Sequence, residues 1–139
     1  EVPLIQLKKE KESAEKYVRR LEIKTPGLNT LAGKLSGGNQ QKISISKWLA
    51  ADCDILIIDE PTVGVDIGAK EYIHDLIWNL VTKENKTVIL ISSDMNEIFS
   101  LARRILVFKD KKIVAELKGE DFFAKPGTEI SAEIGKSFV

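Results

Sequence analysis

The spacing of apolar residues changes several times along the chain, and each change predicts an element. Residues 7–21 are dense in charge but carry a narrow apolar stripe at helical spacing, which predicts an exposed amphipathic helix. The sequence KTPG at 24–27 predicts its end. Helical spacing returns three times, and short apolar runs rich in β-branched residues predict strands. The later helices are expected over 39–51, 69–82 and 95–102, and the strands over 54–58, 87–91, 104–108 and 112–117.

The order of these segments predicts the fold class. The runs at 54–58 and 87–91 are continuously apolar, which is typical of strands buried on both faces of a parallel sheet. A helix separates them, so the chain is expected to be α/β with a mainly parallel sheet. The last two strands are expected to form a hairpin about Asp110-Lys111. Trp48 and Trp78 stand at helical core spacing, so both are expected to pack inside.

Composition narrows the possible chemistry. The 21 acidic and 21 basic residues cancel, so no overall charge favours binding to nucleic acid. The single cysteine, Cys53, excludes an intramolecular disulfide, and its apolar neighbours predict a buried thiol. His74 stands within a predicted helix and is expected to be an ordinary helix-face residue. The longest apolar run, 55–58, is far too short to cross a bilayer.

The sequence LSGGNQQK at 35–42 is the first candidate site. Ser36 and the two glycines, Gly37 and Gly38, open a predicted helix, whose N-terminal N–H groups attract anions. Glycines there let a phosphate approach the backbone closely, and the serine hydroxyl adds a donor. The alternative is a serine N-cap whose glycines only shape the turn. From these residues alone both interpretations stay open.

The sequence ILIIDEPT at 55–62 is the second candidate site. A buried parallel strand delivers Asp59 and Glu60 to the sheet edge where α/β proteins bind ligands. Asp59 at that place can hold Mg²⁺, directly or through water. Glu60 can polarise an attacking water as a general base. The alternative is a pair of solvated loop carboxylates, which the following Pro61 and Thr62 disfavour because they fix the turn.

Taken together, LSGGNQQK, ILIIDEPT, GVDIGAK and VILISSD resemble the second nucleotide-binding domain of ATP-binding-cassette (ABC) importers for simple sugars such as ribose, galactose and xylose. The resemblance covers residues 17–117. It implies a partial P-loop NTPase core with part of the helical subdomain. On this basis 1–50 would be the partial helical subdomain with the signature motif, 51–117 the Walker B, D-loop and switch part, and 118–139 a C-terminal tail.

The resemblance also implies residue roles. The signature motif, which caps the γ-phosphate of a nucleotide held by the opposite domain, corresponds to Leu35, Ser36, Gly37, Gly38, Asn39 and Gln40. Walker B ends at Asp59, which would hold Mg²⁺ through water, and Glu60 takes the place of the catalytic glutamate. The D-loop, which crosses the dimer seam, corresponds to Gly64, Val65 and Asp66.

Three departures from the common pattern qualify these roles. Ser93 stands where many cassette ATPases carry the switch histidine, and serine cannot take a proton near neutral pH as histidine does. Val63 stands where arginine is usual in this branch, and Arg103 where aspartate is usual. No G-x-x-x-x-G-K-[ST] motif occurs in the sequence, so the Walker A half is expected to be absent. The chain is therefore expected to be a truncated domain, inactive alone, whose strand 87–91 has an exposed edge through which it self-associates.

The function implied by the resemblance is that of the ATP-binding and ATP-hydrolysing subunit of a simple-sugar importer. ATP and Mg²⁺ would be required in the intact protein. The expected partners are the first nucleotide-binding domain of the same chain, the membrane permease subunits and, indirectly, a sugar-binding protein, without nucleic acid. The expected location is peripheral, at the cytoplasmic face of the cell membrane. The alternatives are a soluble cassette ATPase outside transport and a non-enzymatic interaction module derived from one.

Overall fold

The computed structural model describes residues 6–119, 132 and 134–135 of the chain. The chain forms two compact units, residues 1–89 and 90–139. Most of the expected tail at 118–139 lies outside the described residues, so the threefold division drawn from the sequence stays a prediction.

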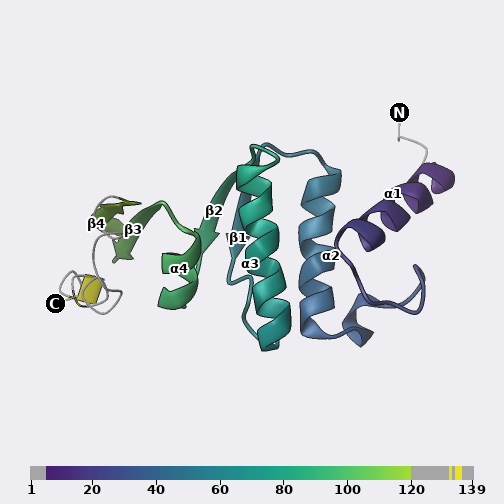
Figure 1. Cartoon of the computed structure of the whole chain (residues 1–139), viewed down its shortest axis with the longest axis horizontal. Coiled ribbons are helices and arrows are strands. Elements are labelled where there is room, and N and C mark those ends of the chain that lie inside the picture. Colours follow the sequence, from purple (N-terminus) through teal and green to yellow (C-terminus); the bar gives the residue numbers. More distant parts are fainter. Residues whose placement is uncertain (1–5, 120–131, 133, 136–139) are drawn as a thin grey trace. The chain divides into compact units, whose positions relative to one another are not determined.

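The first unit contains three helices and the beginning of a sheet (Figure 1). Its elements are α1 (Leu7–Arg20), a short 3₁₀ turn η1 (Ala32–Lys34), α2 (Gly37–Ala50), β1 (Ile55–Asp59), α3 (Ile67–Thr82) and the first residues of β2 (Thr87–Ile91). β1 pairs directly with β2, and α3 makes the crossover between them, which is the connection of a parallel pair. The predicted helices and strands are confirmed, with ends that differ by at most two residues.

The core of this unit lies between the helices and one face of β1. Helices α2 and α3 run side by side and each buries an apolar stripe (Figure 1). Leu56 and Ile58 lie on one face of β1 and are buried against the side chains that these helices contribute. The helical members of the core are Tyr17, Ile45, Leu49, Ile73, Ile77 and Leu80, with Leu21 and Ile23 following α1.

Three expectations about burial are wrong, for the strands, the two tryptophans and Cys53. The alternate residues of β1, Ile55 and Ile57, are 60% and 65% exposed, and β2 is no better covered, so neither strand is buried on both faces. Trp48 and Trp78 are 59% and 44% exposed rather than packed inside. The physical reason is the same for the strands and the tryptophans: nothing among the described residues covers the second face of the sheet or the outer side of α2 and α3. Cys53 is half-buried rather than fully buried.

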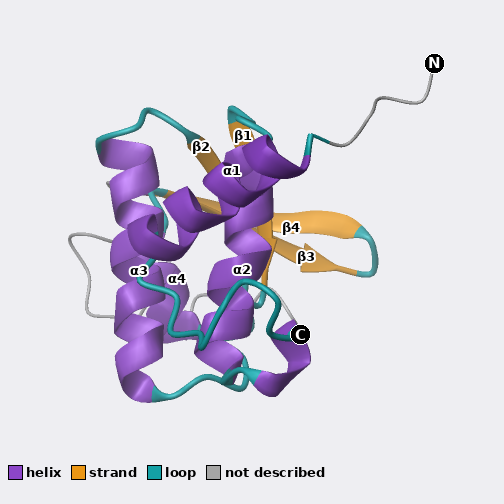
Figure 2. Cartoon of the chain, turned by 90° about the vertical axis from the view of Figure 1, so that its right-hand side faces the viewer, coloured by secondary structure: helices purple, strands orange, loops and turns teal. Residues whose placement is uncertain are grey.

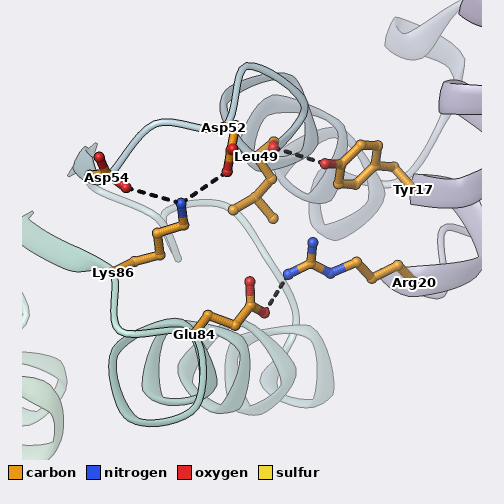
Figure 3. Close-up of polar contacts among 7 residues, drawn as sticks. All are labelled: Tyr17, Arg20, Leu49, Asp52, Asp54, Glu84 and Lys86. Atoms are coloured by element: carbon orange, nitrogen blue, oxygen red, sulfur yellow. Dashed lines mark hydrogen bonds and ion pairs between the residues drawn. The ribbon is translucent and has the colours of Figure 1, made fainter.

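Hydrogen bonds and ion pairs connect the helices of the first unit and the segments that follow them (Figure 3). The buried Tyr17 hydroxyl donates to the Leu49 carbonyl at 2.8 Å and so ties α1 to α2. Arg20 pairs with Glu84 beyond α3, and Lys86 reaches both Asp52 and Asp54, at 3.1 and 3.4 Å. The carboxylates of the Lys86 pairs are almost fully exposed, so these pairs contribute little; the buried tyrosine bond contributes about 1 kcal/mol.

The second unit contains α4 (Met95–Leu101) and an antiparallel hairpin of β3 (Arg104–Lys109) and β4 (Lys112–Lys118) (Figure 2). The predicted turn is confirmed: Asp110 and Lys111 have φ of 49° and 64°, the left-handed values that a two-residue hairpin turn requires. A bulge interrupts the register at Val107 and Phe108. The core of the unit is formed by Ile105, Val107, Leu117 and Ile134, against which Met95, Ile98 and Phe99 from α4 pack.

The described helices include none that combines the length and the apolarity needed to cross a membrane.

The uncovered side of β1 and β2 leads to a prediction about association. Within the described residues β2 pairs only with β1, so its other edge has no strand partner, and Ile89 of β2 is 49% exposed. We expect the isolated chain to form oligomers as concentration rises, and Ile89→Lys to shift it toward monomer, because a charge on an edge strand opposes pairing. Sedimentation velocity over a concentration series measures this. Ile113→Lys, which replaces an isoleucine 56% exposed on the β3–β4 hairpin, is the matched control. A wild-type chain that stays monomeric at high concentration contradicts the expectation.

Candidate functional site

The N-terminus of α2 is formed by the predicted signature residues. Ser36 is the N-cap, with extended backbone angles, and its carbonyl accepts the first helical bond from Gln40 N–H at 3.0 Å. Its side chain makes no cap hydrogen bond to the helix, although the residue stands at the N-cap, as the alternative of a serine N-cap also predicted. Ser36 and Gly37 are exposed, whereas Gly38 is buried. The helix therefore presents its positive end beside an exposed hydroxyl.

The two glycines of this turn are required by packing within the protein. A Cβ on Gly37 would lie 2.7 Å from the Gly64 carbonyl oxygen, and a Cβ on Gly38 would lie 2.6 Å from the Ala69 Cβ. Both distances are too short for real atoms. The sequence predicted glycines for close approach of a phosphate; the structure shows close approach of the D-loop and of α3. The signature turn and the predicted D-loop are thus held against each other.

The end of β1 lies close to the same helix. Asp59 is exposed at the last position of β1, and Glu60 follows half-buried with φ of 46°, a left-handed conformation that costs a non-glycine residue about 1 kcal/mol. The Glu60 carbonyl accepts from Gln41 Nε2 of α2 at 3.4 Å. Pro61 behind it is fully buried. The turn after Walker B is therefore anchored, as the Pro-Thr sequence predicted.

The predicted D-loop leads directly into α3. Gly64 has φ of 73°, which only glycine adopts without strain. Asp66 is the N-cap of α3 and accepts a hydrogen bond from Ala69 N–H at 2.9 Å. Because Ala69 also touches the turn at Gly38, the cap of α3 and the start of α2 share one contact point.

Sequence reasoning missed a buried lysine in this region. Lys42 is only 9% exposed; its Nζ lies 3.3 Å from the Glu22 carbonyl oxygen and 3.4 Å from the centroid of the Tyr72 ring. It borders a cavity of about 350 Å³. Helical spacing could have revealed it, because positions 38, 42, 45 and 49 form one buried face of α2. The cavity is lined by Glu22, Lys24, Ser36, Gly38, Asn39, Lys42, Asp66, Gly68, Ala69 and Tyr72.

Burial has opposite effects on the two titratable groups at this contact. Desolvation lowers the pKa of Lys42, because the charged ammonium is disfavoured away from water. Desolvation raises the pKa of Tyr72, because the charged form of a phenol is the deprotonated one. The raised pKa keeps the Tyr72 ring neutral, whereas the lowered pKa of Lys42 works against the ammonium that contacts this ring.

The remaining predicted residues lie elsewhere. Ser93 is exposed and follows β2 in the second unit, and Arg103 is exposed before β3. Val63, which stands where arginine is usual in the family pattern, is 67% exposed. No group of three or more potential metal-ligating side chains occurs within the residues the structure describes. The assignment of Asp59 and Glu60 to a Mg²⁺ site stays a prediction; such an ion takes one or two carboxylates and completes its shell with water and phosphate.

Several known proteins are similar to this chain in sequence. The family model described as ABC transporter matches residues 4–63. A Burkholderia ambifaria protein named as a ribose/galactose/methyl galactoside import ATP-binding protein is 46% identical over 111 residues, covering 80% of this chain and 21% of that protein. An arabinose import ATP-binding protein of Vibrio parahaemolyticus is 40% identical over 119 residues, covering 86% of this chain and 23% of that protein. The chain thus spans about a fifth of the length of these relatives.

Solved structures agree with the sequence relatives. A dimeric ATP-binding cassette in a post-hydrolysis state, bound to ADP and Pi, matches with a TM-score of 0.73 and 27% identity over 86% of this chain and 51% of the cassette. A second ABC transporter cassette, 21% identical, matches the fold with a TM-score of 0.74 over 100% of this chain and 53% of its own. The described α/β arrangement is therefore about half of such a cassette.

The packing of the glycines can be tested by compensating substitutions. Gly38→Ala is expected to destabilise the chain by about 1–3 kcal/mol through overpacking. Adding Ala69→Gly should relieve the clash, since the next nearest atom, the Ala69 Cα, is 3.9 Å away. Urea unfolding in a double-mutant cycle should show a favourable coupling of at least about 1 kcal/mol. Gly37→Ala is the matched control, because its clash is with a backbone oxygen and Ala69→Gly should not rescue it. Independent effects of Gly38→Ala and Ala69→Gly would contradict the contact.

The buried ammonium predicts a pH dependence of stability. Between the lowered folded pKa of Lys42 and the ordinary 10.5, the unfolded chain binds the proton and the folded chain releases it. The free energy of unfolding of the wild type should therefore rise with pH, relative to Lys42→Met, as pH increases toward 10. Unfolding titrations at pH 7 to 10 measure the difference, and Lys47→Met, at an exposed position of the same helix, is the control. A difference that does not vary with pH would contradict the desolvated ammonium.

Proposed function

Because this chain belongs to the ATP-binding cassette family of ABC transporters, we propose that it is part of the ATP-binding, ATP-hydrolysing subunit of an importer for a simple sugar. The relatives' names support the sugar class. The observation that carries the proposal is the assembly of the signature turn, the D-loop and the end of Walker B around the start of α2.

In this proposal the signature turn acts on a nucleotide held by a partner domain. The Ser36 hydroxyl and the N–H groups that begin α2 stabilise the γ-phosphate of ATP, whose negative charge suits donors and the positive helix end. The D-loop reaches the partner along the same seam, because it packs against the signature turn. Because that nucleotide is bound by the partner, the partner's own G-x-x-x-x-G-K-[ST] loop holds the β-phosphate.

The chain's own carboxylates serve a second site in this proposal. Asp59 holds Mg²⁺ through water, and the ion neutralises phosphate charge when it is bound. Glu60 orients the attacking water. With Ser93 in the switch position this site hydrolyses slowly, and the site completed by Ser36, Gly37 and Gly38 is the more active one. Alone the chain hydrolyses ATP negligibly.

The proposal includes partners and a location. The partners are the first nucleotide-binding domain, the membrane permease subunits and, indirectly, a sugar-binding protein. The subunit is peripheral at the cytoplasmic face of the membrane, where closure of the two domains on ATP opens the permease.

ATP hydrolysis by the intact protein with its permease in proteoliposomes tests the two sites separately. Ser36→Glu places a negative charge against the γ-phosphate and is expected to lower kcat by roughly 10²-fold or more. Ser44→Glu, at an exposed serine of the same helix, is the matched control and should leave kcat unchanged. Glu60→Gln is expected to cost less than about tenfold, well below the loss of a principal general base. Equal effects of Ser36→Glu and Ser44→Glu would overturn the proposal.

A further inference from the structure

A short chain of hydrogen bonds leads from the segment after α1 to the signature serine. The backbone N–H of Lys24 donates to Asn39 Oδ1 at 2.8 Å, and Asn39 Nδ2 donates to Ser36 Oγ at 2.9 Å. On the other side of the turn, Gln40 Nε2 donates to the Leu35 carbonyl at 2.8 Å. Hydrogen bonds from Asn39 and Gln40 therefore hold Ser36 and Leu35, the two residues that precede the glycines.

The direction of each bond follows from the chemistry of the groups. A backbone N–H only donates, so the atom of the Asn39 amide that faces Lys24 must be the oxygen. The amide nitrogen must then face Ser36, and because an NH₂ group only donates, the Ser36 oxygen must accept. A flipped amide would break the bond to Lys24, so only this orientation satisfies both contacts.

The consequence concerns the proton of the Ser36 hydroxyl. With one lone pair used by Asn39, the O–H bond points away from the amide, and within the described part of the chain it has no acceptor. Ser36 is exposed, and its side chain is not spent on capping α2. The hydroxyl is thus set as an outward donor, and each bond in the chain polarises the next in the same sense.

We propose that Asn39 is a positioning residue that fixes the Ser36 hydroxyl as a donor and so adapts the signature turn to an acceptor-only ligand, the fully ionised terminal phosphate of the partner-bound nucleotide. This inference rests on the proposed function and deepens it. Asn39 is assigned to act through Ser36 rather than by touching the nucleotide. The backbone at Lys24 becomes a remote determinant of the site, because it sets the orientation of the amide.

Replacement of Asn39 by Asp tests the direction of the bonds. A carboxylate still accepts from Lys24 N–H but cannot donate, so the Ser36 hydroxyl must turn inward and donate to it. Asn39→Ala removes both bonds and leaves the hydroxyl free to rotate outward. In the intact protein we expect kcat/KM for ATP to fall by roughly 10²-fold in Asn39→Asp and by less than about tenfold in Asn39→Ala. A role in folding alone predicts the opposite order, because Asp retains two hydrogen bonds and Ala retains none.

Asn39→Asp both adds a negative charge and removes the NH₂ donor, so a second experiment must distinguish these two effects. In a Ser36→Ala background there is no hydroxyl to turn, so Asn39→Asp should cost much less there than in the wild type. Similar losses in both backgrounds would mean that charge alone acts and would overturn the inference while leaving the proposed function intact. If Ser36→Ala and Ser36→Glu both leave hydrolysis unchanged, the proposed function itself fails. The melting temperatures of all variants, expected to follow wild type ≥ Asp > Ala, check that activity and folding follow different orders.

Discussion

The first unit depends on one steric constraint, the close approach of the α2 N-terminus to the loop at Gly64 and to Ala69. Only hydrogen fits at these two positions, because Gly37 faces the Gly64 carbonyl oxygen and Gly38 faces the Ala69 Cβ. This contact brings α2 beside α3 and fixes the signature turn to the D-loop. Two segments that the proposed function assigns to a partner's nucleotide are thus in direct contact within one protomer.

Polar side chains on α2 add further contacts that hold its N-terminal half in place. Lys42 joins α2 to the turn at Glu22 and to Tyr72 on α3, with burial opposing its charge and the aromatic ring partly compensating. Asn39 links the same turn region to Ser36. The segment between α1 and η1 carries no recognised motif, but its backbone groups at Glu22 and Lys24 form hydrogen bonds that support the start of α2. In the proposed function, anion binding by this helix end depends on side-chain positioning as well as on the helix dipole.

The errors of the sequence analysis share one cause. A continuous β-branched run such as 55–58 predicts burial on both faces, and aromatic residues at core spacing predict packing. Ile57 and Trp48 instead lie exposed, because no described residue covers these side chains. An apolar pattern indicates the burial that a residue prefers, whereas the tertiary structure decides which faces are covered.

The sequence by itself determined the helices, the strands, the Asp110-Lys111 turn and the resemblance to the family. These follow from periodicity, turn residues and the residues of four motifs, all of which are local properties of the chain. The sequence also determined the identity of the candidate residues. Only the tertiary structure decided what those residues do for one another: that Gly38 is needed against Ala69, that Lys42 is buried and that the Asn39 amide faces Ser36. These relations join positions up to thirty-one residues apart, and spacing along a chain carries no information about which distant backbone a glycine must admit.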